Sequence, residues 1–92
     1  MSSFMVVSTF KSGTNMNEVL KVVGEEQKRV AELQASGMLG STYLATASRQ
    51  CVFLEVFAPD KDEAEAIVQR LPMAKWWNLD VYPLNQPVEV ES

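Results

Sequence analysis

The alternation of hydrophobic and polar positions along the chain predicts four strands and two helices. Short runs rich in β-branched and aromatic residues are typical of strands. Apolar residues spaced three or four positions apart are typical of helices. The predicted strands are residues 4–10, 39–47, 50–57 and 79–84, and the predicted helices are residues 16–36 and the segment that Asp60 opens and Pro72 stops. No element is predicted for residues 73–78. Residues 85–92 are predicted to form a polar tail, so the predicted single domain covers residues 1–84.

Capping residues mark where the predicted helices begin and end. Asn15 and Glu18 have the spacing of a capping box, which starts the first helix. Gly37 follows the last turn of that helix, in the usual place for a left-handed C-terminal cap. Asp60 and Glu63 repeat the capping-box spacing at the start of the second helix.

The resulting element order, β-α-β-β-α-β, predicts an α+β domain with the ferredoxin-like arrangement. The short connection through Ser48 and Arg49 predicts an antiparallel hairpin between the second and third strands. Both faces of the strand 50–57 are apolar, whereas a sheet with one wet face would alternate apolar and polar residues. The helices cover one face, so we expect a second copy of the chain on the other. This predicts a homodimer whose sheets face each other, with a cavity between sheet and helix or between the sheets.

Glu26 is a charged residue at the centre of the apolar stripe of the first predicted helix. The stripe is formed by Val19, Val22, Val23, Val30 and Leu33, with Met16 at its edge. A carboxylate on a buried face must be paired, hydrogen-bonded, or protonated through a raised pKa. Carboxylates placed in this way are candidate proton-transfer groups. The structural alternative is a buried hydrogen bond, or a groove filled with water.

The composition argues against several classes of function. The formal net charge is −4 and no run of Lys or Arg occurs, which argues against nucleic acid and an anionic membrane surface as partners. No apolar stretch approaches the roughly 18–20 residues that span a bilayer, and residues 1–10 show no secretory signal, so a cytoplasmic location is expected. With no histidine and one cysteine, Cys51, neither a metal site nor a Cys–His nucleophile is supported.

RNA-binding modules share this order of elements and stack bases on spaced aromatic residues of their sheet. Phe53 and Phe57 on the third predicted strand have a similar spacing. The acidic net charge, and the position of Glu55 between the two aromatic residues, argue against RNA as a partner.

Three segments of the chain resemble the muconolactone isomerase family. They are EEQKRVAELQASG at 25–37, VFLEV at 52–56 and LPMAKWWNLDVYPL at 71–84. The family combines a charged helix ending in Leu-Gln-x-x-Gly, an apolar strand with an acidic residue, and a Leu-Pro, aromatic and x-Pro-Leu ending. The resemblance implies a dimeric α+β barrel that assembles into larger oligomers. It also implies an enzyme of aromatic-compound degradation that isomerises a small lactone acid by moving a proton, without metal or organic cofactor.

The resemblance and the chemistry of isomerisation together predict roles for individual residues. Glu26 corresponds to a helix glutamate of the family and is our candidate for the base that takes and returns the proton. The developing enolate needs a hydrogen-bond donor or a cation, for which Tyr43 and Arg49 are the first candidates. Ser41 and Lys75 are further candidate donors. The predicted substrate-binding residues are Ser41, Phe53, Glu55, Trp76 and Trp77.

Several of these residues also have purely structural interpretations. Arg49 can be a turn charge in solvent, and Tyr43 can be a packed aromatic residue with a satisfied hydroxyl. Glu55, which corresponds to the acidic residue of the family's third strand, can form an ion pair at the dimer interface. Trp76 and Trp77 can divide between the core and a subunit contact.

The sequence departs from the family pattern in two places. The isomerases carry histidine in the second-strand region, where this chain has Ser41, Thr42 and Tyr43. The tandem Trp76 and Trp77 replace a smaller pattern and suit stacking on a flat aromatic substrate. Two other functions therefore stay open. One is a cofactor-free monooxygenase or polyketide cyclase acting on an aromatic compound, and the other is a non-catalytic dimer that binds a small ligand.

Overall fold

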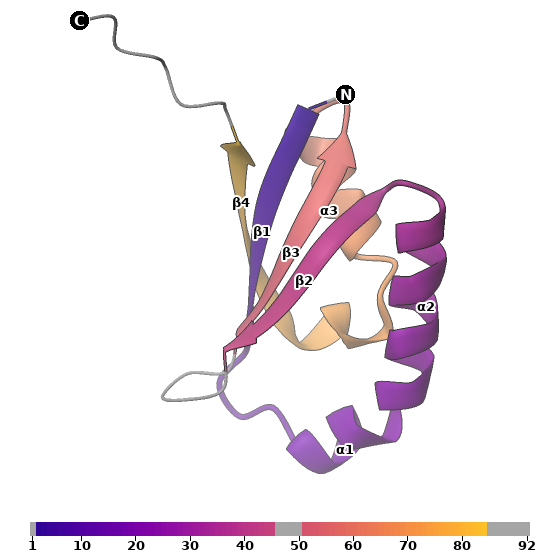
Figure 1. Cartoon of the computed structure of the whole chain (residues 1–92). Helices are drawn as coiled ribbons and strands as arrows, with labels where there is room; N and C mark the ends of the chain where they lie inside the picture. Colours follow the sequence, from indigo (N-terminus) through magenta and orange to yellow (C-terminus); the bar gives the residue numbers. More distant parts are fainter. Residues whose placement is uncertain (1, 46–50, 85–92) are drawn as a thin grey trace, which may run out of the picture.

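The computed structural model describes residues 2–45 and 51–84, which form one antiparallel sheet with helices packed on one of its faces (Figure 1). In chain order the elements are β1 (Ser2–Phe10), α1 (Met16–Lys21), α2 (Val23–Ala35), β2 (Leu39–Ala45), β3 (Cys51–Ala58), α3 (Lys61–Val68), the short 3-10 helix η1 (Pro72–Trp76) and β4 (Trp77–Leu84). The strands lie in the order β2-β3-β1-β4, and each neighbouring pair is antiparallel. This is the ferredoxin-like arrangement, so the predicted α+β fold class is confirmed.

The strands agree with the predicted ones in number and order, and differ from them at their ends. β1 begins at Ser2 and β4 at Trp77, each two residues earlier than predicted. The prediction that Pro72 stops the second helix is wrong, because α3 ends at Val68 and Pro72 opens η1. A proline fits there, since the first N–H of a helix has no partner within it. The predicted hairpin connection through Ser48 and Arg49, strand residues 46, 47 and 50, and the tail 85–92 lie outside the described residues.

The single helix predicted over 16–36 is wrong, because the chain forms two helices that meet at Val22. Val22 has φ −108° and ψ 8°, outside the helical region, although its N–H still bonds to the carbonyl of Val19 at 3.1 Å. Two adjacent valines followed by Gly24 form a run of low helix propensity, which accounts for a break at this place. As a result α1 turns away from the axis of α2 (Figure 1). Val19 is buried against the fold, whereas Leu20 is 66% exposed.

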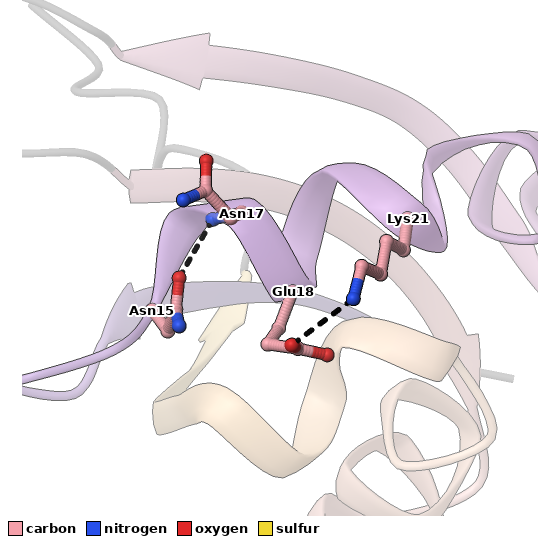
Figure 2. Close-up of polar contacts among 4 residues, drawn as sticks. All are labelled: Asn15, Asn17, Glu18 and Lys21. Carbon is pink, nitrogen blue, oxygen red and sulfur yellow. Dashed lines mark hydrogen bonds and ion pairs between the residues drawn. The ribbon is translucent and has the colours of Figure 1, made fainter.

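Both predicted N-terminal caps form, but the described hydrogen bonds complete neither capping box. Asn15 caps α1, since its Oδ1 accepts the N–H of Asn17 at 2.9 Å (Figure 2). The reciprocal half of the predicted capping box does not form, because the Glu18 carboxylate pairs with Lys21 at 3.2 Å instead (Figure 2). Asp60 caps α3 by accepting an N–H of its first turn at 2.9 Å.

A glycine turn at the end of α2 leads the chain into β2. Gly37 has φ +82°, a conformation that residues with a Cβ rarely adopt. Its N–H bonds to the carbonyl of Gln34 at 3.2 Å, and the N–H of Met38 bonds to the carbonyl of Leu33 at 3.1 Å. This pair of bonds is the Schellman motif, which confirms the predicted left-handed cap.

The two faces of the sheet have different surroundings. On the face that the helices cover, strand side chains pack with α2 and α3 into the core, whose members include Phe4, Val6, Leu33, Leu54, Val56, Ala64, Ile67 and Val68. The opposite face is not covered by any described element, and its side chains are half-buried or exposed. We call it the open face, and its residues include Met5, Val7, Tyr43, Phe53, Glu55, Phe57 and Tyr82. Both faces of β3 are therefore apolar, as the sequence indicates. That a second copy of the chain covers the open face stays a prediction.

Candidate active site

A cavity of about 380 Å³ lies between α2 and the part of the sheet formed by β2 and β3. It is on the helix side of the sheet, one of the two places that the sequence left open. The described residues that line it are Val23, Glu26, Gln27, Val30, Ala31, Gln34, Thr42, Leu44, Val52, Leu54 and Met73. Small-molecule pockets range over roughly 300–1,000 Å³, so this cavity suits a ligand built on a single small ring.

Glu26 is the only charged side chain among the described lining residues, and 8% of its surface is exposed. Its Oε1 accepts the backbone N–H of Met73 at 3.0 Å, which ties α2 to η1. Its Oε2 has no hydrogen bond to a described residue. One oxygen is therefore held by the backbone, while the other has no described partner in a side chain that lines the cavity.

Burial in this apolar wall raises the pKa of Glu26 above the ordinary value of 4.5, because the charged form loses its hydration. The hydrogen bond from Met73 acts in the opposite direction and is the weaker influence. A carboxylate with a raised pKa is a stronger base, and its protonated form persists to higher pH as an acid. The predicted burial of Glu26 is confirmed, and its catalytic role stays a prediction.

The raised pKa predicts a stability penalty at higher pH that Glu26→Gln removes. The folded protein holds this proton more tightly than the unfolded chain does, so protonation stabilises the fold fully below pH 4.5. That contribution is lost as the pH rises through the raised pKa of the folded state. The free energy of unfolding of Glu26→Gln relative to wild type should therefore be higher at about pH 8 than at about pH 4. The expected increase is about 1.4 kcal/mol for each unit by which the pKa of Glu26 is raised. Urea unfolding at both pH values measures the difference.

Glu25→Gln is the matched control for that experiment, because Glu25 precedes Glu26 on α2 and is exposed. It removes one charge from an exposed position of the same helix and so shows how much of any change comes from the loss of charge alone. The same offset for Glu26→Gln at both pH values would contradict a raised pKa.

The side chains of β2 divide between the two faces of the sheet, and the two that line the cavity are not among those predicted for the site. Thr42 and Leu44 line the cavity. Tyr43, between them, points to the open face, where it is 60% exposed and pairs with Phe53 across the strands. Within one chain the sheet separates both aromatic residues from Glu26, and their roles in catalysis and binding stay predictions.

Three neutral polar residues of the lining are missing from the predicted site, namely Gln27, Gln34 and Thr42. Thr42 pairs with Leu54 across the strands, and both face the cavity. Gln27 follows Glu26 on α2 and lies on the same side of the helix. Their side chains can donate or accept hydrogen bonds. The alternation of side chains along the strand shows that Thr42 and Tyr43 face opposite sides of the sheet. The sequence does not show the register, which decides which of the two faces the cavity.

Glu55 has a structural partner where β2 is irregular. The pairing of β2 with β3 shifts register in this stretch, and Glu55 Oε1 accepts the N–H of Ser41 there at 3.2 Å. A Cβ on Gly40 would meet the Glu55 carboxyl and would lie 3.0 Å from the ring of Phe57. Glu55 therefore stabilises the irregularity that decides which β2 side chains face the cavity. Substrate binding by Glu55 and Ser41 stays a prediction.

Gly40→Ala is expected to destabilise the protein by about 0.5–1.5 kcal/mol, because the added methyl group displaces the Glu55 carboxyl from the N–H of Ser41. Gly24→Ala is the matched control, since a Cβ at that position in α2 meets open space. It should stabilise the protein by about 0.5–1 kcal/mol, the usual gain of alanine over glycine in a helix. Urea unfolding of both variants measures the effects. Equal stability of Gly40→Ala and wild type would show that the close approach has no energetic consequence.

The two tryptophans do not line the cavity. Trp77 is 4% exposed and packs edge-to-face on Phe10, with ring centroids 6.1 Å apart and an angle of 76° between the planes. Trp76 is half-buried, and the Nζ of Lys75 lies 4.5 Å from its ring centroid in a cation–π contact. Arg49 lies outside the described residues. A role in the site therefore stays a prediction for Lys75, Trp76, Trp77 and Arg49.

Residues 2–45 and 51–84 contain neither a metal-binding group of side chains nor a membrane-spanning helix. No group of three His, Cys, Asp or Glu side chains in these ranges is placed to hold a metal ion. No helix within them is long and apolar enough to cross a membrane. Cys51 lies with its Sγ 3.7 Å from the hydroxyl of Thr9.

The fold and the cavity define a small ferredoxin-like α+β domain with a buried carboxyl group in an apolar pocket. The sequence model of the muconolactone delta-isomerase family matches residues 3–88, and the chain belongs to this family. The resemblance carried by the three sequence segments is thereby confirmed.

Among solved structures, the chain is similar to 5-chloro-2-hydroxyhydroquinone dehydrochlorinase (TftG) from Burkholderia phenoliruptrix AC1100, in complex with 2,5-dihydroxybenzoquinone. The TM-score is 0.69 at 14% sequence identity, over 92% of this chain and 95% of that chain. At this identity the likeness shows a shared fold. No protein of curated function matches the sequence. Membership in an enzyme family and the shared fold support a small-molecule enzyme.

Proposed function

We propose that the protein isomerises a small cyclic compound by moving a proton through Glu26, without a metal or an organic cofactor. The observation that carries this proposal is the placement of the Glu26 carboxyl. Its Oε1 accepts the N–H of Met73, its Oε2 has no described partner, and the residue lines the cavity. Membership in the muconolactone delta-isomerase family supports the class of reaction.

The proposed reaction begins with Glu26 ionised. Its Oε2 takes a proton from a C–H group next to a carbonyl, and the electron pair of that bond moves toward the carbonyl oxygen to form an enolate. The protonated carboxyl then returns the proton to a different carbon as the electrons move back, which shifts the double bond. The elemental composition of the substrate does not change. The raised pKa of Glu26 suits both steps, because one group acts first as a base and then as an acid.

The enolate oxygen needs a hydrogen-bond donor while it carries charge. Thr42 and Gln27 are the best-placed neutral donors, because one comes from the sheet wall of the cavity and the other from α2 beside Glu26. They are better placed than Tyr43, whose side chain points to the open face.

Dehydrochlorination of a ring is a second candidate reaction, favoured by the similarity to TftG. Such an elimination begins with removal of the same kind of C–H proton. Chloride then leaves with the electrons of its carbon–chlorine bond, and the proton is released to solvent. Glu26 is the proposed base in both reactions.

Turnover of cyclic β,γ-unsaturated ketones and lactones in D₂O tests the isomerase proposal. The expected product is a double-bond isomer formed without consumption of O₂, with deuterium entering the new C–H bond as the carboxyl proton exchanges with solvent. Consumption of O₂ would instead indicate a monooxygenase. Binding without any conversion of the whole series would indicate a ligand-binding module. Either result contradicts the proposal.

A homodimer is also proposed, in which a second copy of the chain covers the open face. Met5, Val7, Phe53 and Phe57 are only half-buried there, and Tyr82 is 54% exposed. A row of apolar side chains of this kind is typical of an interaction surface. The helices already occupy the other face of the sheet. The resemblance to the family likewise implies a dimer of sheets, and a small-molecule substrate would occupy the cavity of each copy.

A further inference from the structure

We propose that Gln34 is a positioning residue for the reaction, because it holds β2 in the register that turns Thr42 toward the cavity. This inference rests on the proposed function, since it concerns the donor that the enolate oxygen needs. The feature that carries it is a hydrogen bond at 3.0 Å, in which the amide of Gln34, a residue of the cavity lining, donates to the carbonyl of Gly40.

The register of β2 changes by one residue at a β-bulge. On β3 a single residue, Glu55, separates the partners of Leu39 and Thr42, whereas two residues separate Leu39 from Thr42 on β2 itself. Gly40 and Ser41 therefore oppose one residue of β3. Bulges of this kind often lie beside active sites, where they change the direction in which a side chain points.

The bulge decides which side chains of β2 face the cavity. Side chains alternate between the two faces of a strand, so an uninterrupted ladder from the buried Leu39 would place Ser41 and Tyr43 on the cavity side. The extra residue reverses this arrangement, since Thr42 and Leu44 line the cavity and Tyr43 is 60% exposed on the open face. The bulge therefore selects a threonine hydroxyl, rather than a tyrosine hydroxyl, as the group beside the substrate.

Gln34 connects this bulge to the helix that carries Glu26. Both side chains lie on the cavity side of α2, and Gln34 belongs to its last turn. The backbone of Gln34 is held in turn, because its carbonyl accepts the N–H of Gly37 at 3.2 Å. A bulge disrupts the ladder locally, so contacts from outside the ladder contribute to its register. One helix thus carries the proposed base and, through Gln34, fixes the strand that carries the proposed donor.

A second hydrogen bond holds the bulge from the opposite side. The Glu55 Oε1 accepts the N–H of Ser41 at 3.2 Å. Gly40 leaves room for this carboxyl, which a Cβ at that position would meet. The bonds from Gln34 and Glu55 engage adjacent residues of the bulge, so loss of the Gln34 bond should weaken the register of the whole strand.

NMR of protein labelled at its Leu, Val and Thr methyl groups tests the register without any need for turnover. In wild type the Thr42 methyl should give a nuclear Overhauser effect to Leu54, its partner across the strands. Gln34→Met keeps the length of the side chain and removes the donor, and it should weaken this effect at least about twofold. Because Gln34 is exposed, the variant is expected to fold. Gln69→Met makes the same change at an exposed position after α3 and should leave the effect intact.

Kinetics on a substrate that the wild type converts in the D₂O experiment test the positioning role. Gln34→Met should lower kcat at least about fivefold and change KM less than about twofold, because the donor acts on the transition state. Thr42→Val, which removes the hydroxyl itself, should lower kcat at least as much. In the Thr42→Val background, Gln34→Met should change kcat less than about twofold, since both substitutions remove the same donor.

Two results would overturn the proposal. One is a wild-type Overhauser effect between Thr42 and Leu54 in Gln34→Met, which would show that the amide does not hold the register. The other is a pair of effects on kcat that multiply in the double variant, which would show that Gln34 does not act through Thr42. Failure of the proposed function is seen separately, as an absence of conversion by wild type while the Overhauser effect still weakens in Gln34→Met.

Discussion

Glu26→Gln is expected to lower kcat by about 10²–10⁴-fold on any substrate that the wild-type protein isomerises, the usual contribution of a general base. Glutamine has nearly the same shape and can still accept the N–H of Met73 through its amide oxygen, so the cavity should keep its form. It cannot take up a proton from carbon. KM should change little for an uncharged substrate, because the variant retains the walls of the cavity. Steady-state kinetics of both proteins measure the two constants.

Glu25→Gln provides the control for this loss of activity. Glu25 is exposed and is not part of the cavity lining. The control should keep kcat within about twofold of wild type, since surface changes away from a site have small effects. A Glu26→Gln variant that turns over at the wild-type rate would show that another group takes the proton. The mechanism proposed for the cavity would then be wrong.

Phe53→Asp is expected to convert the proposed dimer into a monomer. Phe53 lies on β3 at the centre of the open face, next to Val7 of β1 and Tyr43 of β2. Across a two-fold interface the change occurs twice, and each new carboxylate would be buried without a partner. The dissociation constant should therefore rise by at least about a hundredfold. Sedimentation or light scattering at several protein concentrations measures the mass.

Leu20→Asp is the matched control for the assembly experiment. Leu20 is 66% exposed on α1, away from the open face, so the same chemical change there should leave the dimer intact. Circular dichroism checks that both variants remain folded. A wild-type protein that is monomeric at all concentrations, or a Phe53→Asp variant with the mass of a dimer, would contradict the proposed interface.

The order of elements and the burial of Glu26 could be predicted because each depends on local sequence. The predicted strands rest on the β-branched and aromatic composition of the four runs. The burial of Glu26 follows from its place on a helical stripe, which needs only the sequence spacing and one covered face. The cap at Gly37 is predicted for a similar reason, since its positive φ favours glycine at that position.

The break at Val22 and the facing of β2 could not be predicted, because neither is decided by periodicity. A helix over 16–36 fits the apolar spacing, but tertiary contacts bury Val19 and let the chain break at a run of weak helix formers. In β2, the register shift near Gly40 decides that Thr42 faces the cavity and Tyr43 does not. A shift of one residue moves every following side chain to the other face, and the contact between Ser41 and Glu55 that accompanies it is long-range.

The pKa of the Glu26 carboxyl, measured by NMR titration of carbon-labelled protein, tests the central claim most directly. The claim is that a buried carboxyl in an apolar cavity serves as the proton-transfer group. A pKa clearly above 4.5, which rises further when a small ring displaces water from around the carboxyl, is the predicted result. A pKa for Glu26 at or below the ordinary value, insensitive to ligands, would contradict the account.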